Sequence, residues 1–254
     1  MVTDESNKRI ELLNLAGSFI GEIGTIGNRS IGGGASLFQC PRQLCIQPGT
    51  HNVLVADYGN NCVQMFTENF QYLYAFGHQY LQYPNAVDSN ISQQIVAVDR
   101  RNQAYLFTSD GQRLIRSFCK HGDFSSAADQ TNEVWGICFD NHHNSLYICD
   151  YFNQKISIWS ADGSTFIGNI KMPEYQYPCS VNVDRFYNNN RLMVGSYNAK
   201  VFVFDTRKES HVIQEIGGVG EKVGQFAGYV NGVVVDEYGT LWCTDYKNHR
   251  IQSF

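Results

Sequence analysis

A tetrapeptide of the form Asp-x-x-Asn recurs along this chain of 254 residues, and no other feature restricts its fold as strongly. The five intact copies are Asp4–Asn7, Asp57–Asn60, Asp99–Asn102, Asp150–Asn153 and Asp245–Asn248. A sixth, degraded copy, Ser196-Tyr197-Asn198-Ala199, falls in register with them, and the leading positions lie between 42 and 53 residues apart. A period in this range is typical of repeat architectures in which every copy is one supersecondary unit.

Each copy lies between two short runs rich in β-branched and aromatic residues. Val53–Ala56 precedes the copy at Asp57, and Cys62–Phe66 follows it. Runs of this kind, separated by Asp, Asn and Gly, indicate the two strands of a hairpin. In the turn we expect the Asp carboxylate to accept backbone N–H groups and the Asn to adopt a left-handed conformation. The Asp and the Asn of every intact copy are therefore assigned a structural role.

Two further strands complete each unit. Upstream of the copy at Asp150, the run Ile137–Asp140 is strand-like and ends in an acid; downstream, the turn Asp162-Gly163 precedes the apolar run Phe166–Ile170. Four antiparallel strands with short turns form one blade of a β-propeller. The sequence therefore predicts an all-β propeller, in which neighbouring blades cover both faces of each blade.

The repeats resemble the NHL family of β-propellers. The segment Gly220–Phe254 follows the family pattern most closely, with the hallmark pair Asn248-His249, and Asn7-Lys8-Arg9-Ile10 is a near copy. Asn60 and Asn153 depart from the pattern because no His follows them. The resemblance implies about six blades.

The blade count supports one domain over residues 1–254. Residues 1–24 supply only the last three strands of a blade, and residues 226–254 supply only the first three. Either the sequence is part of a longer chain, or both end blades are three-stranded. The four complete blades are expected at 37–77, 83–122, 131–171 and 177–217.

Composition narrows the possible environment. Hydrophobic residues make up 43% of the chain, which is enough for a large core, and the net charge is −5. We find no signal peptide at the start and no run of 18 apolar residues, so no membrane segment is expected. The eight cysteines contain no Cys-x-x-Cys pair and lie in or beside predicted strands, which favours buried free thiols in the cytoplasm.

Aromatic and basic residues occupy the variable positions of the turns. In a propeller these turns share one face, and Tyr, Phe and Arg on loops are typical of binding hot spots. An alternative is that each Tyr simply packs over its own turn. The predicted partner-binding rim consists of Tyr58, Arg100, Arg101, Tyr151, Phe152, Tyr197, Tyr246, Lys247 and His249.

Two alternative functions remain open at this point. RNA binding would use basic residues near the turns, such as Lys8, Arg9 and Arg250, although the acidic net charge opposes it. Resemblance to propeller hydrolases and lactonases would place a hard cation on Asn85, Glu133 and Asn231, at the starts of the inner strands. The propeller lyases that perform amidation would instead need histidines at these starts, and the sequence has none there.

The leading prediction is a non-catalytic binding scaffold. NHL propellers commonly serve as substrate-recognition parts of ubiquitin ligases, and the resemblance implies a protein or peptide partner on the turn face. We therefore expect a monomer without enzymatic activity, cofactor or metal. The glycine-rich segment Gly24–Gly34 lacks the Lys-Ser/Thr of a phosphate-binding loop and is interpreted as a connection between blades.

Overall fold

The computed structural model describes residues 1–24, 38–121, 127–186, 190–207 and 211–254, and in these ranges the chain is built from strands. Two single-turn 3-10 helices, η1 (Tyr58–Asn60) and η2 (Tyr246–Asn248), are the only helices there. None of the described helices has the length and hydropathy needed to cross a membrane. The glycine-rich connection predicted after Gly24 falls mostly on residues 25–37, outside the described ranges.

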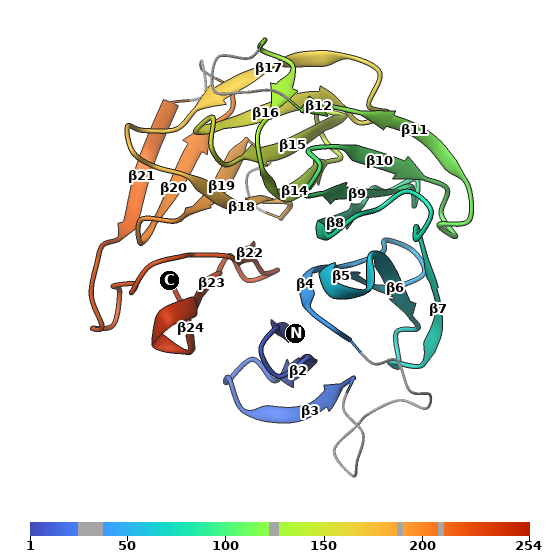
Figure 1. Cartoon of the computed structure of the whole chain (residues 1–254). Helices are drawn as coiled ribbons and strands as arrows, with labels where there is room; N and C mark the ends of the chain where they lie inside the picture. Colours follow the sequence, from blue (N-terminus) through green and yellow to red (C-terminus); the bar gives the residue numbers. More distant parts are fainter. Residues whose placement is uncertain (25–37, 122–126, 187–189, 208–210) are drawn as a thin grey trace. The chain divides into compact units, whose positions relative to one another are not determined.

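The chain divides into two compact units, and unit 1 covers Met1–Phe118. It contains three antiparallel sheets, in which strands that are consecutive in sequence are neighbours (Figure 1). The first sheet is β1 (Val2–Asp4), β2 (Arg9–Leu13) and β3 (Phe19–Ile23). The second is β4 (Pro41–Ile46), β5 (Val53–Asp57), β6 (Cys62–Phe66) and β7 (Tyr72–Phe76). The third is β8 (Pro84–Ser89), β9 (Ile95–Asp99), β10 (Ala104–Phe107) and β11 (Leu114–Phe118).

Unit 2, Cys119–Phe254, contains three more antiparallel sheets of the same kind. A short parallel pair, β12 (Lys120–His121) with β13 (Gln130–Thr131), was not expected from the sequence. The first antiparallel sheet is β14 (Val134–Asp140), β15 (Ser145–Asp150), β16 (Lys155–Ser160) and β17 (Phe166–Lys171). The second is β18 (Pro178–Val183), β19 (Arg191–Ser196), β20 (Lys200–Asp205) and β21 (His211–Gly217). The last is β22 (Val233–Val235), β23 (Leu241–Asp245) and β24 (Arg250–Ser253).

These sheets are the blades of a six-bladed β-propeller, which confirms the predicted fold class. The four central blades are four-stranded, and the first and last blades are three-stranded. The repeat period predicted the fold correctly because each turn connects two strands that are neighbours both in the sequence and in the sheet.

The core lies between neighbouring sheets within each unit. In β5, β9 and β15 every residue is buried, as expected for strands covered on both faces. One core cluster of unit 1 includes Leu54 and Phe107, and one of unit 2 includes Phe202. Burying a side chain of this size stabilises the fold by roughly 2–3 kcal/mol. All eight cysteines are free thiols, and six of them are buried.

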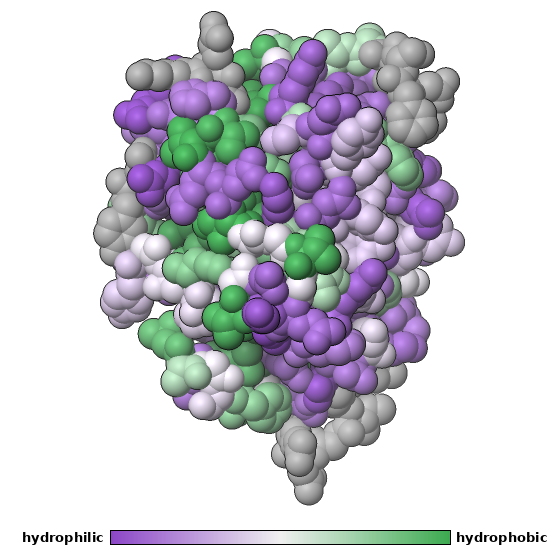
Figure 2. Space-filling view, turned by 90° about the vertical axis from the view of Figure 1, so that its left-hand side faces the viewer, coloured by the Kyte–Doolittle hydropathy of each residue, from purple (hydrophilic) through white to green (hydrophobic). Residues whose placement is uncertain are grey.

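The outer strand of each of five blades carries a β-bulge at the same place. The partner register skips one residue there, and the skipped residue is always an exposed Ile or Leu. A bulge increases the local twist of an edge strand, and this hinders pairing with another chain. Figure 2, which faces the side that carries β21, shows apolar side chains reaching the surface among polar ones. The bulged residues are Ile20, Leu73, Ile115, Ile167 and Ile213.

Candidate functional site

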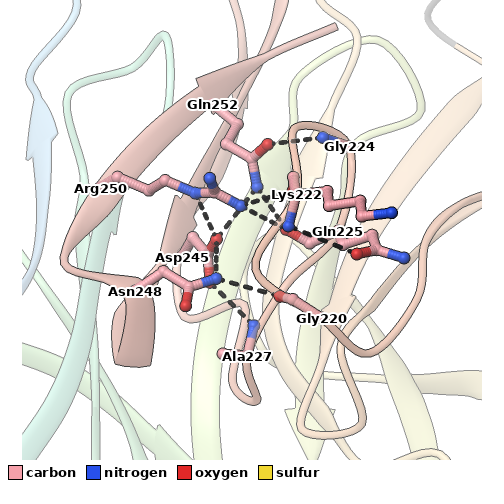
Figure 3. Close-up of polar contacts among 9 residues, drawn as sticks. All are labelled: Gly220, Lys222, Gly224, Gln225, Ala227, Asp245, Asn248, Arg250 and Gln252. Atoms are coloured by element: carbon pink, nitrogen blue, oxygen red, sulfur yellow. Dashed lines mark hydrogen bonds and ion pairs between the residues drawn. The ribbon is translucent and has the colours of Figure 1, made fainter.

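The Asp is a buried hydrogen-bond acceptor in every intact repeat turn except the first, where Asp4 is half-buried, and Figure 3 shows the arrangement for Asp245. Its carboxylate accepts bonds from the backbone N–H of Ala227 at 3.0 Å and from Asn248 Nδ2 at 2.8 Å. Arg250 Nε donates at 2.8 Å and Gln252 Nε2 at 3.0 Å. The side chain of Asp245 is 0% exposed, so these four donors replace the water that the carboxylate loses.

In the intact copies from Asp57 onward, the backbone donor to the Asp belongs to the loop before the first strand of the same blade. This donor lies 17 or 18 residues before the Asp. The sequence analysis expected donors from the turn itself, and these occur at Asp4 and Asp99. The Asp therefore connects two loops at one end of the blade. The remaining loop donors are Gln39 and Cys40 for Asp57, Gln82 for Asp99 and Asn132 for Asp150.

The left-handed residue of these turns usually follows the Asn, which corrects the expectation that the Asn itself takes this conformation. Asn61, Gln154 and His249 have φ angles of 55°, 51° and 50°. The Asn side chain instead reaches back three residues, as in the 2.7 Å bond from Asn60 to Asp57. Only in the copy at Asp99 does the Asn, Asn102, have a positive φ of 66°.

Several basic residues near the turns are engaged by carboxylates. Arg9 contacts Asp4 at 3.1 Å and also Glu22, while Arg101 contacts the buried Asp99 at 3.3 Å. Arg250 bonds to Asp245, as described above. These pairs hold cations that an RNA-binding face would direct at phosphate groups. The geometry therefore argues against RNA binding at these positions.

The first strand of each central blade is irregular where it begins, and this irregularity presents one side chain beside the turn. The residue after the first paired position is skipped in all four strands, and in two of them the next residue is skipped as well: Arg42 and Gln43 in β4, Asn85 in β8, Trp135 and Gly136 in β14, and Cys179 in β18. Bulges of this kind redirect side chains and are common near active sites. A proline is the first residue of β4, β8 and β18. Proline is tolerated there because the first residue of a strand need not donate a backbone hydrogen bond to the neighbouring strand.

A group of aromatic rings forms at one end of the three antiparallel blades of unit 2. Trp135 stacks on Tyr151, with ring centroids 5.0 Å apart and planes 20° apart, and lies 6.3 Å from Tyr229. Tyr197 meets Tyr229 edge-on at 4.3 Å. Contacts of this type stabilise by about 0.5–1.5 kcal/mol each beyond burial. We name this group the tyrosine cluster; it consists of Trp135, Tyr151, Tyr177, Tyr197, Tyr229 and Tyr246.

Backbone contacts fix the loops that carry these rings. The N–H of Tyr151 donates to the Glu133 carbonyl at 3.1 Å, and the N–H of Tyr197 donates to the Tyr177 carbonyl at 2.9 Å. Gly195 is required for a close approach, because a Cβ there would collide with the Val230 carbonyl in the loop that carries Tyr229. The ends of β15 and β19 are thereby held against the loops that precede the first strands β14, β18 and β22.

Charged groups lie at two places along the tyrosine cluster. Glu133 Oε1 accepts a hydrogen bond from Trp135 Nε1 at 3.1 Å, and the ammonium of Lys247 lies 5.7 Å from the centroid of the Tyr229 ring. The hydrogen bond with Tyr197, followed by burial, raises the pKa of Tyr229 to about 12. Burial, with a further contribution from nearby groups that include the Glu133 charge, raises the pKa of Tyr151. Both hydroxyls therefore stay protonated at neutral pH and can donate.

The corresponding positions of unit 1 hold two arginines. The Arg42 guanidinium lies 3.8 Å from the centroid of the Tyr58 ring, and Tyr83 packs against that ring at 5.0 Å. Arg100 Nη1 donates to the Tyr58 hydroxyl at 2.9 Å. We name Arg42, Tyr58, Tyr83 and Arg100 the Arg–Tyr cluster. Its four residues occupy, in the same order, the repeat positions that hold Trp135, Tyr151, Tyr177 and Tyr197 in unit 2.

The predicted rim residues divide between these clusters. Within unit 2 the structure brings Tyr151, Tyr197 and Tyr246 into one group, with Phe152 edge-on to Tyr151 and Lys247 over Tyr229. Tyr58 and Arg100 belong to the Arg–Tyr cluster of unit 1. Two others lie elsewhere. The Arg101 side chain contacts Asp99 and Tyr105, and His249 is an exposed left-handed turn residue.

The sequence analysis missed the residues that precede the first strands as members of these groups. None of Arg42, Tyr83, Trp135, Tyr177 and Tyr229 was predicted as a site residue. Tyr83 and Tyr177 each come directly before a Pro that begins a first strand, in the same way as Cys40 in the second blade. The proline is the sequence feature that could have marked the residue before it as the one next to the turn.

The metal interpretation finds little support. Arg42 donates to Asn85 Oδ1, and a guanidinium at this oxygen opposes a cation there. Among the described residues no group of three or more His, Cys, Asp or Glu could hold a metal ion. Glu133 and Asn231 thus remain without the additional acidic ligands that a hard cation favours.

Comparisons with known proteins identify the fold and an enzyme that shares it. No protein-family model and no curated protein matches the sequence. A solved streptogramin B lyase structure matches with a TM-score of 0.66 over 99% of this chain and 77% of that chain, at 12% sequence identity. At this identity the likeness shows a shared propeller fold, and the NHL family itself is not shown.

This match overturns the leading functional prediction. The sequence analysis expected a non-catalytic binding scaffold without enzymatic activity, associated with ubiquitin ligases. The solved propeller that covers almost the whole chain is instead an enzyme, a lyase. The earlier prediction went wrong because repeat turns report the fold, while catalysis depends on side chains that differ from blade to blade.

Proposed function

We propose that this chain is an enzyme that acts on a small organic molecule at the tyrosine cluster of unit 2, with Glu133 as general base. One observation carries the proposal: the Glu133 carboxylate is held by Trp135 Nε1 at 3.1 Å, beside aromatic rings and tyrosine hydroxyls. A positioned carboxylate next to protonated donors is the minimum equipment for proton transfer. The lyase fold relative supports an enzyme of this class.

The proposed reaction is an elimination. Glu133 takes a proton from a carbon of the substrate, and the electrons of that C–H bond form a double bond to the neighbouring carbon. The bond from the neighbouring carbon to a leaving oxygen or nitrogen breaks. The leaving group takes a proton from a tyrosine hydroxyl, which regains one from water while Glu133 releases its own. A Glu in this position can equally activate water, and that reaction would be hydrolysis.

Tyr197 and Tyr229 are the best placed proton donors. They are hydrogen-bonded to one another, and this bond together with burial raises the pKa of Tyr229. Lys247, 5.7 Å from the Tyr229 ring centroid, places a positive charge near the same pair. A cation and hydroxyl donors stabilise negative charge that develops on a leaving group.

Exposed aromatic rings beside the cluster would bind a flat or apolar part of the substrate. Tyr246 is 50% exposed and Phe152 is 36% exposed. Such rings bind planar groups through dispersion and ring stacking, with little loss of side-chain entropy. The proposed substrate is therefore a small molecule with an aromatic or apolar portion and a leaving group that can be eliminated.

Mass spectrometry of reaction products tests this proposal. The purified chain is incubated with streptogramin B, the substrate that the solved lyase's name gives, and with simple lactones and esters. Elimination leaves the summed mass of the products equal to that of the substrate, whereas hydrolysis adds one water. The proposal expects turnover of at least one of these, and it expects Glu133→Gln to lower kcat by about 100-fold or more.

A second glutamate of unit 2 provides the matched control. Glu174 is exposed, and Glu174→Gln should leave turnover within about twofold of the wild type because surface substitutions have small effects. Absence of turnover with all substrates, or equal losses in the two variants, would contradict the assignment of Glu133.

Two finer inferences accompany this proposal. We infer that the repeats are of the NHL type, on the strength of the segment Gly220–Phe254. We also infer a cytoplasmic location, because eight free thiols fit a reducing compartment. Burial raises the pKa of Cys62 to about 12, as expected for an inert core thiol.

A further inference from the structure

We propose that the Arg–Tyr cluster of unit 1 is a binding site for an oxyanion, the carboxylate or phosphate group of a small molecule. The proposal rests on Arg42, Tyr58, Tyr83 and Arg100, and it is independent of the activity proposed for unit 2. Two guanidinium groups contact one tyrosine, Tyr58, although the chain has a net charge of −5. Guanidinium groups suit carboxylate and phosphate because their N–H groups form a planar fork.

Arg42 has donor capacity to spare. Its guanidinium lies 3.8 Å from the Tyr58 ring centroid, donates a hydrogen bond to Asn85 Oδ1 and also interacts with the Cys40 side chain. Its Nε is buried and has no hydrogen-bond partner among the residues that the structure describes. The ion pair from Arg42 Nη2 to Glu5 is long, at 3.7 Å. Buried donors without partners are costly, so an anion that draws on this guanidinium gains more than it would from a saturated one.

Tyr58 supplies a hydroxyl whose oxygen is already an acceptor. Its oxygen accepts from Arg100 Nη1 at 2.9 Å, and its own proton is in no hydrogen bond within the described ranges. Because the oxygen already accepts from a cation, the O–H is polarised and becomes a stronger donor. An anion beside this hydroxyl would also lie next to the exposed Arg100 side chain.

Packing holds the ring in place before any ligand binds. Tyr83 covers it at 5.0 Å, and the N–H of Tyr58 donates to the Cys40 carbonyl at 3.0 Å. The preceding carboxylate, Asp57, is fully buried, and its oxygens accept bonds from backbone and amide donors. A rigid site of this kind loses little entropy on binding.

Glu5 is the exposed carboxylate that competes for the site. Its side chain is 44% exposed, and it also accepts a hydrogen bond from the Cys40 thiol at 2.9 Å. An oxyanion would take the place that Glu5 now holds loosely beside Arg42. Removal of the Glu5 charge should therefore strengthen anion binding, which is the opposite sign to the loss of an arginine.

Isothermal titration calorimetry and NMR titration of the whole chain test the site, with inorganic phosphate and benzoate as probes. Arg42→Gln and Arg100→Gln should each weaken binding at least about tenfold, since charged hydrogen bonds carry most of the affinity. Tyr58→Phe should weaken it about threefold to tenfold while the ring is kept. Glu5→Gln should strengthen it several-fold. Tighter binding of phosphate indicates a phosphate ester as the ligand, and tighter binding of benzoate indicates a carboxylic acid.

An exposed arginine of the same unit serves as the control. Arg116→Gln on β11 should bind both probes within about twofold of the wild type. Absence of saturable binding in the wild type overturns the proposal, as does equal weakening by the control. If the arginine variants do not fold, Tyr58→Phe and Glu5→Gln still decide, and unchanged affinity in both overturns it.

Discussion

The Arg–Tyr cluster of unit 1 and four members of the tyrosine cluster of unit 2 occupy the same blade positions with different chemistry. In unit 1 the residue beside the tyrosine is Arg42, at 3.8 Å, and in unit 2 it is Trp135, at 5.0 Å. The partner from the next turn is Arg100 in one case and Tyr197 in the other. The backbone scaffold is shared, so the difference lies in the side chains alone.

This comparison teaches how a repeat protein acquires distinct sites. The turn Asp ties two loops together in both units, and the bulged start of the first strand presents one side chain over the following turn. Substitution at that single place converts an aromatic stack into a cationic one. The fold therefore tolerates the change, because no strand pairing depends on the residue that is exchanged.

The largest expected effect concerns the shared scaffold. Asp57→Ala in unit 1 and Asp150→Ala in unit 2 should each lower the free energy of unfolding by about 3 kcal/mol. Each carboxylate is fully buried, and its loss removes the acceptor of a backbone N–H bond and of a bond from an Asn amide. Urea denaturation followed by circular dichroism measures both. A loss below about 1 kcal/mol in one unit would break the claim that the scaffold is common.

The next effect separates the clusters themselves. Trp135→Ala should lower the free energy of unfolding by about 2–3 kcal/mol, because Trp135 contacts Tyr151, Tyr229 and Glu133. Arg42→Ala should cost only about 1 kcal/mol, since a partly exposed cation–π contact is weaker. The same denaturation experiment compares them. Equal costs would mean that the two clusters stabilise their units alike.

A smaller effect tests the tyrosine pair of unit 2. Tyr197→Phe removes the hydrogen bond that is the first cause of the raised pKa of Tyr229, so that pKa should fall from about 12 toward the ordinary value of 10. Ultraviolet titration of tyrosine ionisation, assigned by NMR, reports the change. Tyr175→Phe, at an exposed position of the same unit, should leave the Tyr229 titration where it was.

The smallest effect is a difference in pH dependence between Asp4 of unit 1 and Asp150 of unit 2. Burial would raise the pKa of Asp4, but bonds from Asn7 and Arg9 outweigh it and lower the pKa below 3.8. Burial raises the pKa of Asp150, and bonds from Asn132 and Asn153 only partly offset this. Stability from Asp4 is present above its unfolded pKa and is lost as pH falls, whereas stability from protonated Asp150 is lost as pH rises.

Two asparagine variants measure this difference through the free energy of unfolding over roughly pH 3 to 6. Asp4→Asn should make the chain less sensitive to acid than the wild type. Asp150→Asn should make the loss of stability on acidification steeper, because the wild-type group opposes it. The same direction of change in both variants would contradict the assigned pKa shifts.

The blades could be predicted from the amino-acid sequence alone. The period of the turns and the β-branched runs around them predicted a series of blades, and the resemblance to the NHL family implied about six. The missing strands at both ends indicated either three-stranded end blades or a sequence that is part of a longer chain. These features are local: strands that pair are neighbours in sequence, so a short window contains the information. The predicted strand Val53–Ala56, for example, differs from β5 by one residue.

Only the tertiary structure decided which side chains meet. Trp135 and Tyr229 are far apart in sequence, and the loop approach at Gly195 brings Tyr229 to the tyrosine cluster. The sequence also did not show in which direction a side chain points. Arg250 contacts the buried Asp245, whereas Arg100 contacts the Tyr58 hydroxyl. A repeat pattern specifies the backbone of each blade, but contacts between blades depend on packing that no single repeat contains.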